Sequence, residues 1–481
     1  MSTSLLDDVS TLFPEWFTPA QTARAKTIFY KEMALRCHHF YGGKMMTVPK
    51  AGIFSPNDVN IWYTPGVSKV STTIRDNPLS SFYLTGRGNT VAVVSDSTRV
   101  LGDGDVTPPG GLGVMEGKAL LMKVLGGLDA VPLCIDSRGP DGTPDPERII
   151  QFVEMVQHSF AAINLEDISQ PNCYRVLDVL RERCEIPVWH DDAQGTGSVA
   201  LAGLINALKV AEKSLHDVRI VFIGAGAANT ATARLVITAG GDPDRIVMFD
   251  SRGALSRNRS DIEENPAFYR KWELCQQTNP DAITDLETAL KGADVLIAIS
   301  RPGPDAIPPA WIQSMADKAI LFALANPVPE IYPHAAHEAG ALVVATGRGD
   351  FPNQANNSLG FPGILKGAIL ARARRISDGM AITAARSLAH FAEEKGISPE
   401  RILPDMSDPM LFATEAADVA MQAVTEGLAR HAMRREDYLA LAREEIMESH
   451  ALFQHLMDEK IIKPPPESLV QECLRLAISQ V

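Results

Sequence analysis

Two pairs of adjacent acidic residues, Glu166-Asp167 and Asp191-Asp192, each follow a largely apolar run of the chain. Adjacent carboxylates repel each other and are costly to remove from water. Four of them at the ends of buried strands therefore indicate oxygen ligands for a hard cation such as Mg²⁺ or Mn²⁺. The alternative interpretation is that both pairs cap helices, because Asp and Glu are common at N-caps and in first turns.

A glycine turn, Gly224-Ala225-Gly226, follows the apolar run 218–223 and precedes an expected helix over 230–239. A dinucleotide pyrophosphate needs such a turn, because glycine lets the backbone approach the phosphates and the helix start offers unpaired N–H groups. An ordinary strand-to-helix turn is the alternative, since the third motif position is neither glycine nor alanine. The candidate cofactor-binding residues of this turn are Gly224, Gly226, Ala227 and Asn229.

Asp250 closes the next expected strand, over 246–249. An acid at this position accepts hydrogen bonds from the adenosine ribose hydroxyls and repels a 2′-phosphate. We therefore expect NAD as the cofactor. NADP stays possible, because Arg252 offers a guanidinium group to a 2′-phosphate.

The chain of 481 residues carries 45 Lys and Arg against 59 Asp and Glu, a formal net charge of −14. This balance argues against nucleic acid or an anionic membrane as the main partner, so an anionic substrate has to meet local positive charge. The six cysteines show no CxxC spacing, which argues against a zinc site or a disulfide framework. Without a signal-like start or an apolar run of membrane-spanning length, the sequence predicts a soluble, cytoplasmic protein.

Apolar, β-rich runs alternate with helix-like stretches over residues 91–192, which predicts βαβ units around a parallel sheet. A second unit of alternating strands and helices follows, with the glycine turn after its first strand. From about 364 onward the chain has helical periodicity. The predicted fold class is α/β, with an N-terminal α/β substrate domain (1–192), a Rossmann-type doubly wound dinucleotide-binding domain (193–375) and a helical C-terminal segment (376–481).

Eight short segments stand in an order that is typical of one family. They are YTPGV (63–67), TRVLGDGD (98–105), VMEGKAL (114–120), INLED (163–167), HDDAQGT (190–196), FALANP (322–327), DFPNQANN (350–357) and FPG (361–363). Through these segments, from about 60 to 380, the chain resembles the malic enzymes. That family oxidatively decarboxylates malate to pyruvate with a nicotinamide cofactor and a divalent metal.

The resemblance implies three catalytic residues. Lys118 is the implied base for the C2 hydroxyl of malate, with a pKa lowered by burial or by the metal so that it is neutral when needed. Asp191 is implied to orient Lys118. Tyr63 is the implied acid that protonates C3 after CO₂ leaves, and it exchanges protons with Lys118.

The resemblance also implies the ligands of the metal, the substrate and the cofactor. It makes Glu166, Asp167 and Asp192 the ligands of Mg²⁺ or Mn²⁺, which leaves Asp191 outside the metal shell. Arg99 offers a planar fork to the 1-carboxylate of malate. Asn326 and Asn357 are implied amide donors to substrate and nicotinamide, with Asn356 as the alternative to Asn357.

Two departures from the family pattern keep other substrates open. Arg301 stands where the family more often has a small residue, and Ala193-Gln194 differs from many bacterial relatives. The alternatives are an oxaloacetate decarboxylase, an enzyme for another β-carboxylated 2-hydroxy acid or, in a different class, a non-catalytic nucleotide-sensing module. We further expect a homodimer or larger homo-oligomer, from the apolar helical tail and the family's habit.

Overall fold

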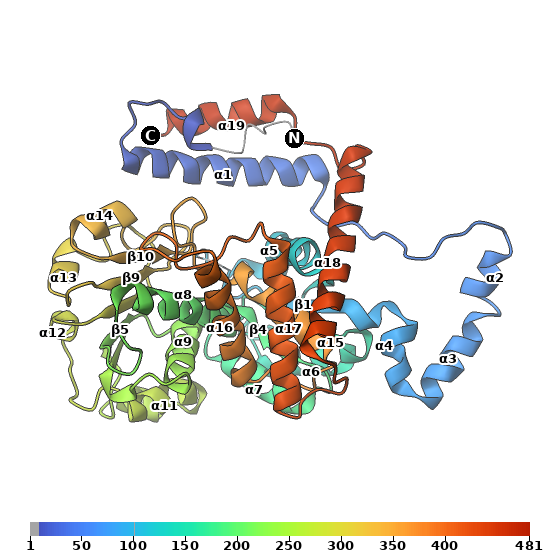
Figure 1. The fold of residues 1–481 in the computed structure, drawn as a ribbon, viewed down its shortest axis with the longest axis horizontal. Helices are drawn as coiled ribbons and strands as arrows, with labels where there is room; N and C mark the ends of the chain where they lie inside the picture. The colour runs from blue at the N-terminus through green and yellow to red at the C-terminus, as the bar shows by residue number, and fades with distance from the viewer. Residues whose placement is uncertain (1–8, 101) are drawn as a thin grey trace. The chain divides into compact units, whose positions relative to one another are not determined.

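A computed structural model of the chain describes residues 9–100 and 102–481, and these form two compact units (Figure 1). The smaller unit combines the N-terminal residues up to Val48 with Ala451–Val481, and the larger unit is Pro49–His450. Leu101, which belongs to the segment 98–105, lies outside the described residues. The domain boundaries expected after 192 and 375 stay predictions.

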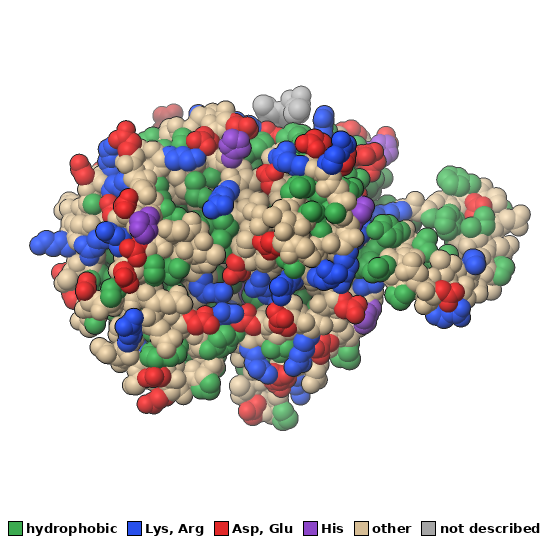
Figure 2. All heavy atoms as spheres, turned by 60° about the horizontal axis from the view of Figure 1, so that its bottom comes forward, with side chains coloured by type: hydrophobic (Ala, Val, Ile, Leu, Met, Phe, Trp, Pro, Cys, Tyr) green, Lys and Arg blue, Asp and Glu red, His purple; other side chains and the backbone are tan. Residues whose placement is uncertain are grey.

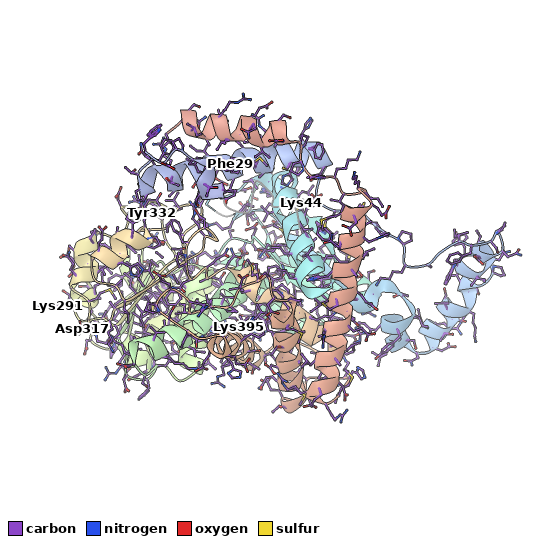
Figure 3. The ribbon with its side chains drawn as sticks, turned by 45° about the horizontal axis from the view of Figure 1, so that its top comes forward. Phe29, Lys44, Lys291, Asp317, Tyr332 and Lys395 are labelled. Atoms are coloured by element: carbon purple, nitrogen blue, oxygen red, sulfur yellow. The ribbon has the colours of Figure 1, made fainter. Side chains whose placement is uncertain are left out.

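The smaller unit joins the two ends of the chain, a pairing that no sequence pattern indicated. Its elements are η1 (Val9–Leu12), α1 (Pro19–Tyr41) and α19 (Glu467–Ser479). Thr18 caps α1 in a reciprocal capping box with Gln21. Phe29 of α1 is fully buried and meets Phe13 edge to face, with ring centroids 6.3 Å apart (Figure 3). The two terminal segments thus share one apolar core.

A parallel sheet of four strands opens the larger unit, as the alternating pattern predicted. Its order is β2 (Asp129–Cys134), β1 (Thr90–Ser95), β3 (Ala162–Leu165) and β4 (Val188–His190). Three helices connect these strands: α5 (Thr107–Gly126), α6 (Pro146–Val156) and α7 (Asn172–Arg183). Because the strand order reverses between β1 and β3, their carboxyl ends border the crevice where ligands bind in such sheets.

The second sheet has six strands and the doubly wound topology of a Rossmann-type domain. Its order is β10 (Val343–Thr346), β9 (Ile320–Ala323), β8 (Val295–Ala298), β5 (Ile220–Ile223), β6 (Ile246–Asp250) and β7 (Gly253–Ala254), with only β7 antiparallel. The strand order reverses between β5 and β8, and the glycine turn follows directly after β5. The predicted fold class, α/β with a Rossmann-type domain and C-terminal helices, is therefore confirmed.

Helix α8 (Thr196–Ala211) leads from the first sheet into the second and is buried over most of its length. The helical periodicity expected from about 364 onward is present and includes α15 (Phe361–Leu370) and α17 (Pro409–Thr425). The remaining main helices are α2 (Asp58–Trp62), α3 (Val67–Asp76), α4 (Ser81–Leu84), α9 (Ala227–Thr238), α11 (Tyr269–Gln277), α16 (Asp378–Glu394) and α18 (Arg435–Asp458). In the described part of the chain, no helix has both the length and the apolarity to cross a membrane.

Replacing Phe29 with alanine tests the core of the smaller unit. The substitution removes a fully buried ring, so we expect a loss of about 3–5 kcal/mol in the free energy of unfolding of that unit. Denaturant unfolding and limited proteolysis near the chain ends measure it. Lys31→Ala, at an exposed position of the same helix, is the matched control and should change the stability by less than about 0.5 kcal/mol. Equal effects of the two substitutions would contradict the assigned core.

Candidate active site

The two acidic pairs lie together because they follow neighbouring parallel strands. Glu166 and Asp167 come directly after β3, and Asp191 and Asp192 come directly after β4. Neighbouring parallel strands end at the same edge of a sheet, so the four carboxylates converge there. Glu166, Asp167 and Asp191 are only 2%, 4% and 0% exposed. The carboxylates therefore lie in the interior and not on a solvated helix face.

Helix capping does not account for the second pair. Asp191 and Asp192 begin a π-helical turn, η5 (Asp191–Gly195), but no side-chain hydrogen bond caps this turn. The Asp192 carboxylate accepts a hydrogen bond from the backbone N–H of Asp167 at 2.7 Å. Single π-turns are rare and often occur at functional sites. Asp192 is thus turned toward the β3 end and not toward its own helix.

Lys118 of α5 is buried against two of these carboxylates. Its ammonium group donates a hydrogen bond to Asp191 and lies 3.0 Å from a Glu166 oxygen. The ring centroid of Phe361 lies 4.6 Å from Nζ. A buried ammonium is costly unless it is paired, so this ion-pair cluster fixes where the middle of α5 meets both strand ends.

Further side chains, which the sequence did not single out, hold the carboxylates in place. The indole N–H of Trp189 donates to Asp191 at 3.2 Å, and the amide of Asn164 donates to Glu166 at 2.9 Å. Gly195 is required by close approach, because a Cβ there would lie 2.0 Å from an oxygen of Asp191. The only sequence signal for Trp189 and Asn164 was their position at the ends of apolar runs beside the acidic pairs.

The charges within the cluster shift its pKa values strongly. Burial lowers the pKa of Lys118, but the carboxylates of Asp191, Glu166 and Asp192 together outweigh burial and raise it. The expectation of a lowered lysine pKa is therefore wrong for the chain by itself. Burial, reinforced by Asp192, raises the pKa of Glu166 to about 8. Lys118 thus stays charged beside Asp191, and Glu166 readily holds a proton.

Three carboxylates of the cluster fit a divalent cation. One oxygen from each of Glu166, Asp167 and Asp192 can be chosen so that all lie within 4.8 Å of one another. Ligands on opposite sides of an octahedral Mg²⁺ are about 4.2 Å apart, so small side-chain shifts suffice for coordination. Asp167 also adopts a left-handed backbone conformation, with φ 54°, a strain that is typical of functional positions. The donor set is the hard oxygen set that Mg²⁺ and Mn²⁺ prefer.

His190 is a buried neighbour of the cluster that the sequence did not indicate as a functional residue. Its imidazole is 0% exposed, and neither ring nitrogen has a hydrogen-bond partner among the described residues. Its Nδ1 lies 3.8 Å from an Asp192 oxygen. Burial lowers the pKa of His190 to about 4, so the ring is neutral at physiological pH.

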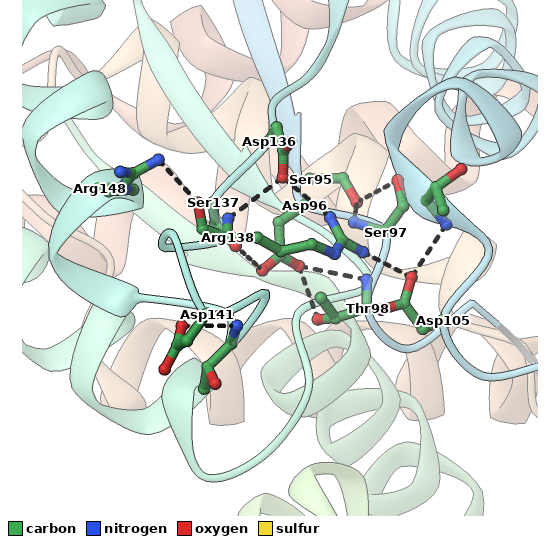
Figure 4. A network of polar contacts seen from close by, with 12 residues as sticks. Ser95, Asp96, Ser97, Thr98, Asp105, Asp136, Ser137, Arg138, Asp141 and Arg148 are labelled. Carbon is green, nitrogen blue, oxygen red and sulfur yellow. Dashed lines mark hydrogen bonds and ion pairs between the residues drawn. The ribbon is translucent and has the colours of Figure 1, made fainter.

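Arg99 is held at the cluster by its backbone, while its side chain is exposed. Its N–H donates to the carbonyl oxygen of Asp167 at 3.0 Å. The loop that carries it is tied down by buried Asp96, which accepts hydrogen bonds from the hydroxyls of Thr98 and Ser137, each at 2.7 Å (Figure 4). The guanidinium of Arg138, the residue after Ser137, forms an ion pair with the carboxylate of Asp105 at 2.6 Å. The guanidinium of Arg99 is therefore available at an anchored position for an anionic ligand.

The two candidate asparagines lie on loops that meet this edge from the second sheet. Asn326 follows β9. Its backbone carbonyl oxygen lies 2.9 Å from the position that a Cβ would take at Gly102, so it is close to the segment 98–105. The Cβ of Asn357 lies 3.5 Å from a Cβ added at Gly195. The side-chain oxygen of Asn356 instead accepts a hydrogen bond from the backbone N–H of Ser358 at 3.0 Å. Asn357 is therefore the amide that is free for a ligand.

The glycine turn has the geometry that a dinucleotide needs. Gly224 has φ 95°, and a Cβ there would lie 2.2 Å from the carbonyl oxygen of Ile299, so only glycine fits. Gly226 directly precedes α9, and a Cβ there would meet nothing within 4 Å. Asn229 is fully buried, and its amide donates to the carbonyls of Ile223 and Gly224. Asn229 therefore braces the turn from behind, which explains an amide at the third motif position.

Asp250 ends β6 as expected, but it already has a cationic partner. Arg259 donates to both carboxylate oxygens of Asp250, at 3.0 and 2.9 Å, and also pairs with Asp261. Arg252 lies outward, with a side chain that is 73% exposed. No sequence signal indicated Arg259, because the contact arises from a loop that turns back on the strand. The position expected for the adenosine ribose therefore has both the Asp250 carboxylate and the Arg259 guanidinium beside it.

Two predicted residues lie apart from the cluster. Arg301 is exposed on the loop after β8, next to Ser300, whose Cα is 3.4 Å from a Cβ added at Gly224. Tyr63, between α2 and α3, is 70% exposed. Within the described residues its side chain has no hydrogen bond, ion pair or ring contact. The chain by itself therefore does not bring Tyr63 to Lys118.

A Rossmann-type domain beside a buried lysine and carboxylate cluster defines a class, the pyridine-nucleotide oxidoreductases. Comparison with known proteins narrows this class. Two family models match: "Malic enzyme, N-terminal domain" over residues 43–181 and "Malic enzyme, NAD binding domain" over residues 193–425. The chain belongs to the malic enzyme family, whose members are NAD- or NADP-dependent oxidoreductases.

Individual relatives agree with this assignment. An NAD-dependent malic enzyme from Geobacillus stearothermophilus is 42% identical over 82% of this chain and 79% of its own length. A bifunctional malic/malolactic enzyme from Bacillus subtilis is 39% identical over 83% and 94%. The crystal structure of the Entamoeba histolytica malic enzyme superimposes with a TM-score of 0.97, at 57% identity over 99% of this chain and 98% of that chain. The resemblance inferred from the short segments is confirmed.

Direct measurement of Mn²⁺ binding tests the three carboxylate ligands. We expect the unmodified chain to bind Mn²⁺ without substrate, and Asp192→Asn to weaken the affinity at least about tenfold, because it removes a charged ligand. Electron paramagnetic resonance of free Mn²⁺ gives the affinity. Asp141→Asn, in an exposed loop, is the control and should leave the affinity unchanged. An unchanged affinity in Asp192→Asn would refute the site.

The raised pKa of Glu166 predicts a pH dependence of this binding. A proton on Glu166 competes with the cation, so the affinity should increase as the pH rises toward about 8 and level off above it. Calorimetry in two buffers of different ionisation enthalpy should detect proton release on binding below that pH. Glu166→Gln removes the titrating group and should flatten the profile. A steep profile that persists in Glu166→Gln would assign the titration to another group.

Proposed function

We propose that this chain oxidatively decarboxylates malate to pyruvate and CO₂, with reduction of NAD(P)⁺ and dependence on Mg²⁺ or Mn²⁺. The observation that carries the proposal is the burial of Lys118 against Asp191 and Glu166, at the edge where three carboxylates can hold a cation. A base and a cation site at one substrate-sized location are what a β-carboxylated 2-hydroxy acid requires.

Proton transfer begins at the C2 hydroxyl of malate. A divalent cation held by Glu166, Asp167 and Asp192 would polarise the C2 oxygen and offset the carboxylate charges that raise the pKa of Lys118, and a nicotinamide cofactor held at the glycine turn would supply the hydride acceptor. Lys118 then takes the hydroxyl proton at Nζ. Asp191 keeps Nζ in position and stabilises the resulting ammonium through their hydrogen bond. The raised pKa of Lys118 in the chain alone thus makes catalysis dependent on the cation.

The remaining steps return this proton to the substrate. Loss of the 4-carboxyl group as CO₂ leaves its bonding electron pair on the three-carbon product as an enolate. The hydroxyl of Tyr63 donates a proton to C3 and gives pyruvate, and the ammonium of Lys118 reprotonates the tyrosinate. The proton taken from C2–OH therefore replaces the CO₂ lost from C3, and no net proton is consumed.

The anionic substrate is held by groups around the cluster. Arg99 binds the 1-carboxylate, since its guanidinium is exposed on a loop that the Asp96 network anchors. Asn326 and Asn357 donate amide hydrogens from the second sheet to substrate and nicotinamide. The cofactor pyrophosphate binds at Gly224 and Gly226, against the start of α9.

The charges at Asp250 bear on the choice between NAD and NADP. An unpaired Asp250 would repel a 2′-phosphate, but its pairing with Arg259 reduces that repulsion. We infer that NAD is preferred and that NADP is still accepted. The relatives include both NAD- and NADP-dependent enzymes.

A non-catalytic nucleotide sensor has little to support it in this structure. Such a protein needs only the glycine turn and its surroundings. It does not need an ammonium and several carboxylates buried together, which cost several kcal/mol to remove from water. Decarboxylation of oxaloacetate alone would use the same residues, and no described feature favours it over malate oxidation.

The reaction is tested by following absorbance at 340 nm with malate, each cofactor and Mn²⁺. We expect reduced cofactor to form, and EDTA to abolish its formation. Lys118→Ala should lower kcat at least about hundredfold, because it removes the base. Lys123→Ala, on the same helix, removes a lysine that pairs with Asp129 and should change kcat only slightly. Absence of malate-dependent turnover with either cofactor would refute the proposed function.

A further inference from the structure

One buried carboxyl group lies outside the acidic cluster described above. Figure 2 shows Asp and Glu side chains spread over the visible face of the protein, where water solvates them. Glu330, between β9 and the helix α14 (Pro333–Glu338), is by contrast 0% exposed. Burial raises its pKa, and no cation among the described residues forms an ion pair with it. A carboxyl group in such a place is costly unless hydrogen bonds compensate it.

Three hydrogen bonds from two different loops compensate the Glu330 carboxyl group. Ser300, on the loop after β8, donates its backbone N–H to Oε1 at 2.8 Å and its hydroxyl to the same oxygen at 3.1 Å. Ala325, on the loop after β9, donates its backbone N–H to Oε2 at 3.0 Å. A single side chain therefore spans the two loops, with one oxygen for each.

The backbone of Glu330 holds the other end of the first of these loops. Its carbonyl oxygen accepts a hydrogen bond from the backbone N–H of Ile307 at 3.1 Å. Ile307 is itself 1% exposed. The segment 300–307, which we call the β8 loop, is thus attached to Glu330 at both of its ends.

The β8 loop runs from the glycine turn to the segment 98–105. At its start, the Cα of Ser300 lies 3.4 Å from a Cβ added at Gly224. Further along, the Cγ of Pro302 lies 3.6 Å from a Cβ added at Gly102. The loop therefore borders both the turn expected to bind the cofactor and the segment expected to bind the substrate.

The loop after β9, which carries Asn326, is also held from a second side. Arg348 donates to the carbonyl oxygen of Pro327 at 3.0 Å and, through two further nitrogens, to both carboxylate oxygens of Asp350 at 2.8 Å. The side chains of this ion pair are only 9% and 10% exposed. Loss of the Glu330 carboxylate should therefore release the β8 loop more than the loop of Asn326.

We propose that Glu330 is a positioning residue for hydride transfer. By tying the β8 loop to the loop of Asn326, it fixes the nicotinamide of the cofactor relative to C2 of the substrate. Glu330 acts through these loops and takes no part in the bond changes. Hydride transfer requires closely aligned carbons, and a displacement of about 1 Å lowers the rate about hundredfold. The inference rests on the proposed function, because that function places hydride transfer at this site.

Oxaloacetate tests the alignment, because this keto acid has two fates at the proposed site. Reduction to malate consumes the hydride of the reduced cofactor and one proton. Decarboxylation to pyruvate releases CO₂, consumes one proton and leaves the cofactor unchanged. With oxaloacetate, Mn²⁺ and reduced cofactor, we expect Glu330→Gln to lower the ratio of malate to pyruvate at least about tenfold. Whichever way the new amide turns, its NH₂ group faces N–H donors, so one of the two loops loses its acceptor.

The ratio separates positioning from a contribution to stability alone. Loss of folded protein lowers both products equally, so an unchanged ratio in Glu330→Gln, after correction for the reaction without enzyme, overturns the proposal. Ser300→Ala removes one of the three donors and should shift the ratio in the same direction by a smaller factor. If Glu330→Gln does not fold, an unchanged ratio in Ser300→Ala overturns the proposal instead.

A matched control makes the same substitution at an exposed position. Glu338→Gln, at the end of α14, removes a carboxylate that lies close in the sequence, and it should leave the ratio unchanged. An equal shift in Glu338→Gln would overturn the proposal, because the effect would then come from the loss of charge and not from release of the loop.

Amide hydrogen exchange of the chain without cofactor or metal measures the attachment of the loop directly. We expect peptides from the β8 loop to exchange at least about fivefold faster in Glu330→Gln than in the wild type. Unchanged exchange would overturn the proposal. A wild type without malate-dependent turnover refutes the proposed function, and exchange then still decides whether Glu330 holds the loop. A wild type that turns over malate, with an unchanged product ratio in the variant, refutes this inference alone.

Discussion

The ammonium of Lys118 lies inside the protein against Asp191 and Glu166, and much of the larger unit serves to keep this arrangement in place. A buried charge that loses its partner costs several kcal/mol, so α5, β3 and β4 are bound to one relative position. Trp189, Asn164 and Gly195 then act on the carboxylates and not on the lysine. The cluster thus determines both the packing of the sheet edge and the chemistry available there.

The same cluster is the reason we propose that the site depends on a cation. The carboxylates of Asp191, Glu166 and Asp192 raise the pKa of Lys118, and burial together with Asp192 raises the pKa of Glu166. In the proposed mechanism, a divalent cation held by Glu166, Asp167 and Asp192 would offset these charges and let Lys118 accept a proton. The repulsion among the carboxylates and their suitability for a cation are therefore two consequences of one arrangement. The topological reversals of both sheets supply the crevice in which this occurs.

Part of this architecture was readable from local patterns. Strand and helix periodicity predicted the two parallel sheets, and the acidic pairs were placed correctly at strand ends, because burial on both faces leaves a strong apolar signal. The pairing of α1 with α19 was not predictable, since nothing local relates residue 29 to residue 473. The bond from Arg259 to Asp250, nine residues apart, was missed because it forms only when the loop after β6 turns back on the strand, although it changes the charge at the ribose position.

The sequence by itself determined which residue types are candidates for the chemistry: a lysine, the acidic pairs, a glycine turn and a tyrosine, in the order of one family. Tertiary structure decided how these residues are used. In the folded chain Asp191 accepts a hydrogen bond from Lys118, Asn229 donates to the backbone of the glycine turn, and Tyr63 is exposed. Residue types and their order are properties of the chain, whereas pKa values, partners and exposure depend on what packs around each side chain. Distances between residues far apart in sequence are set only when the chain folds.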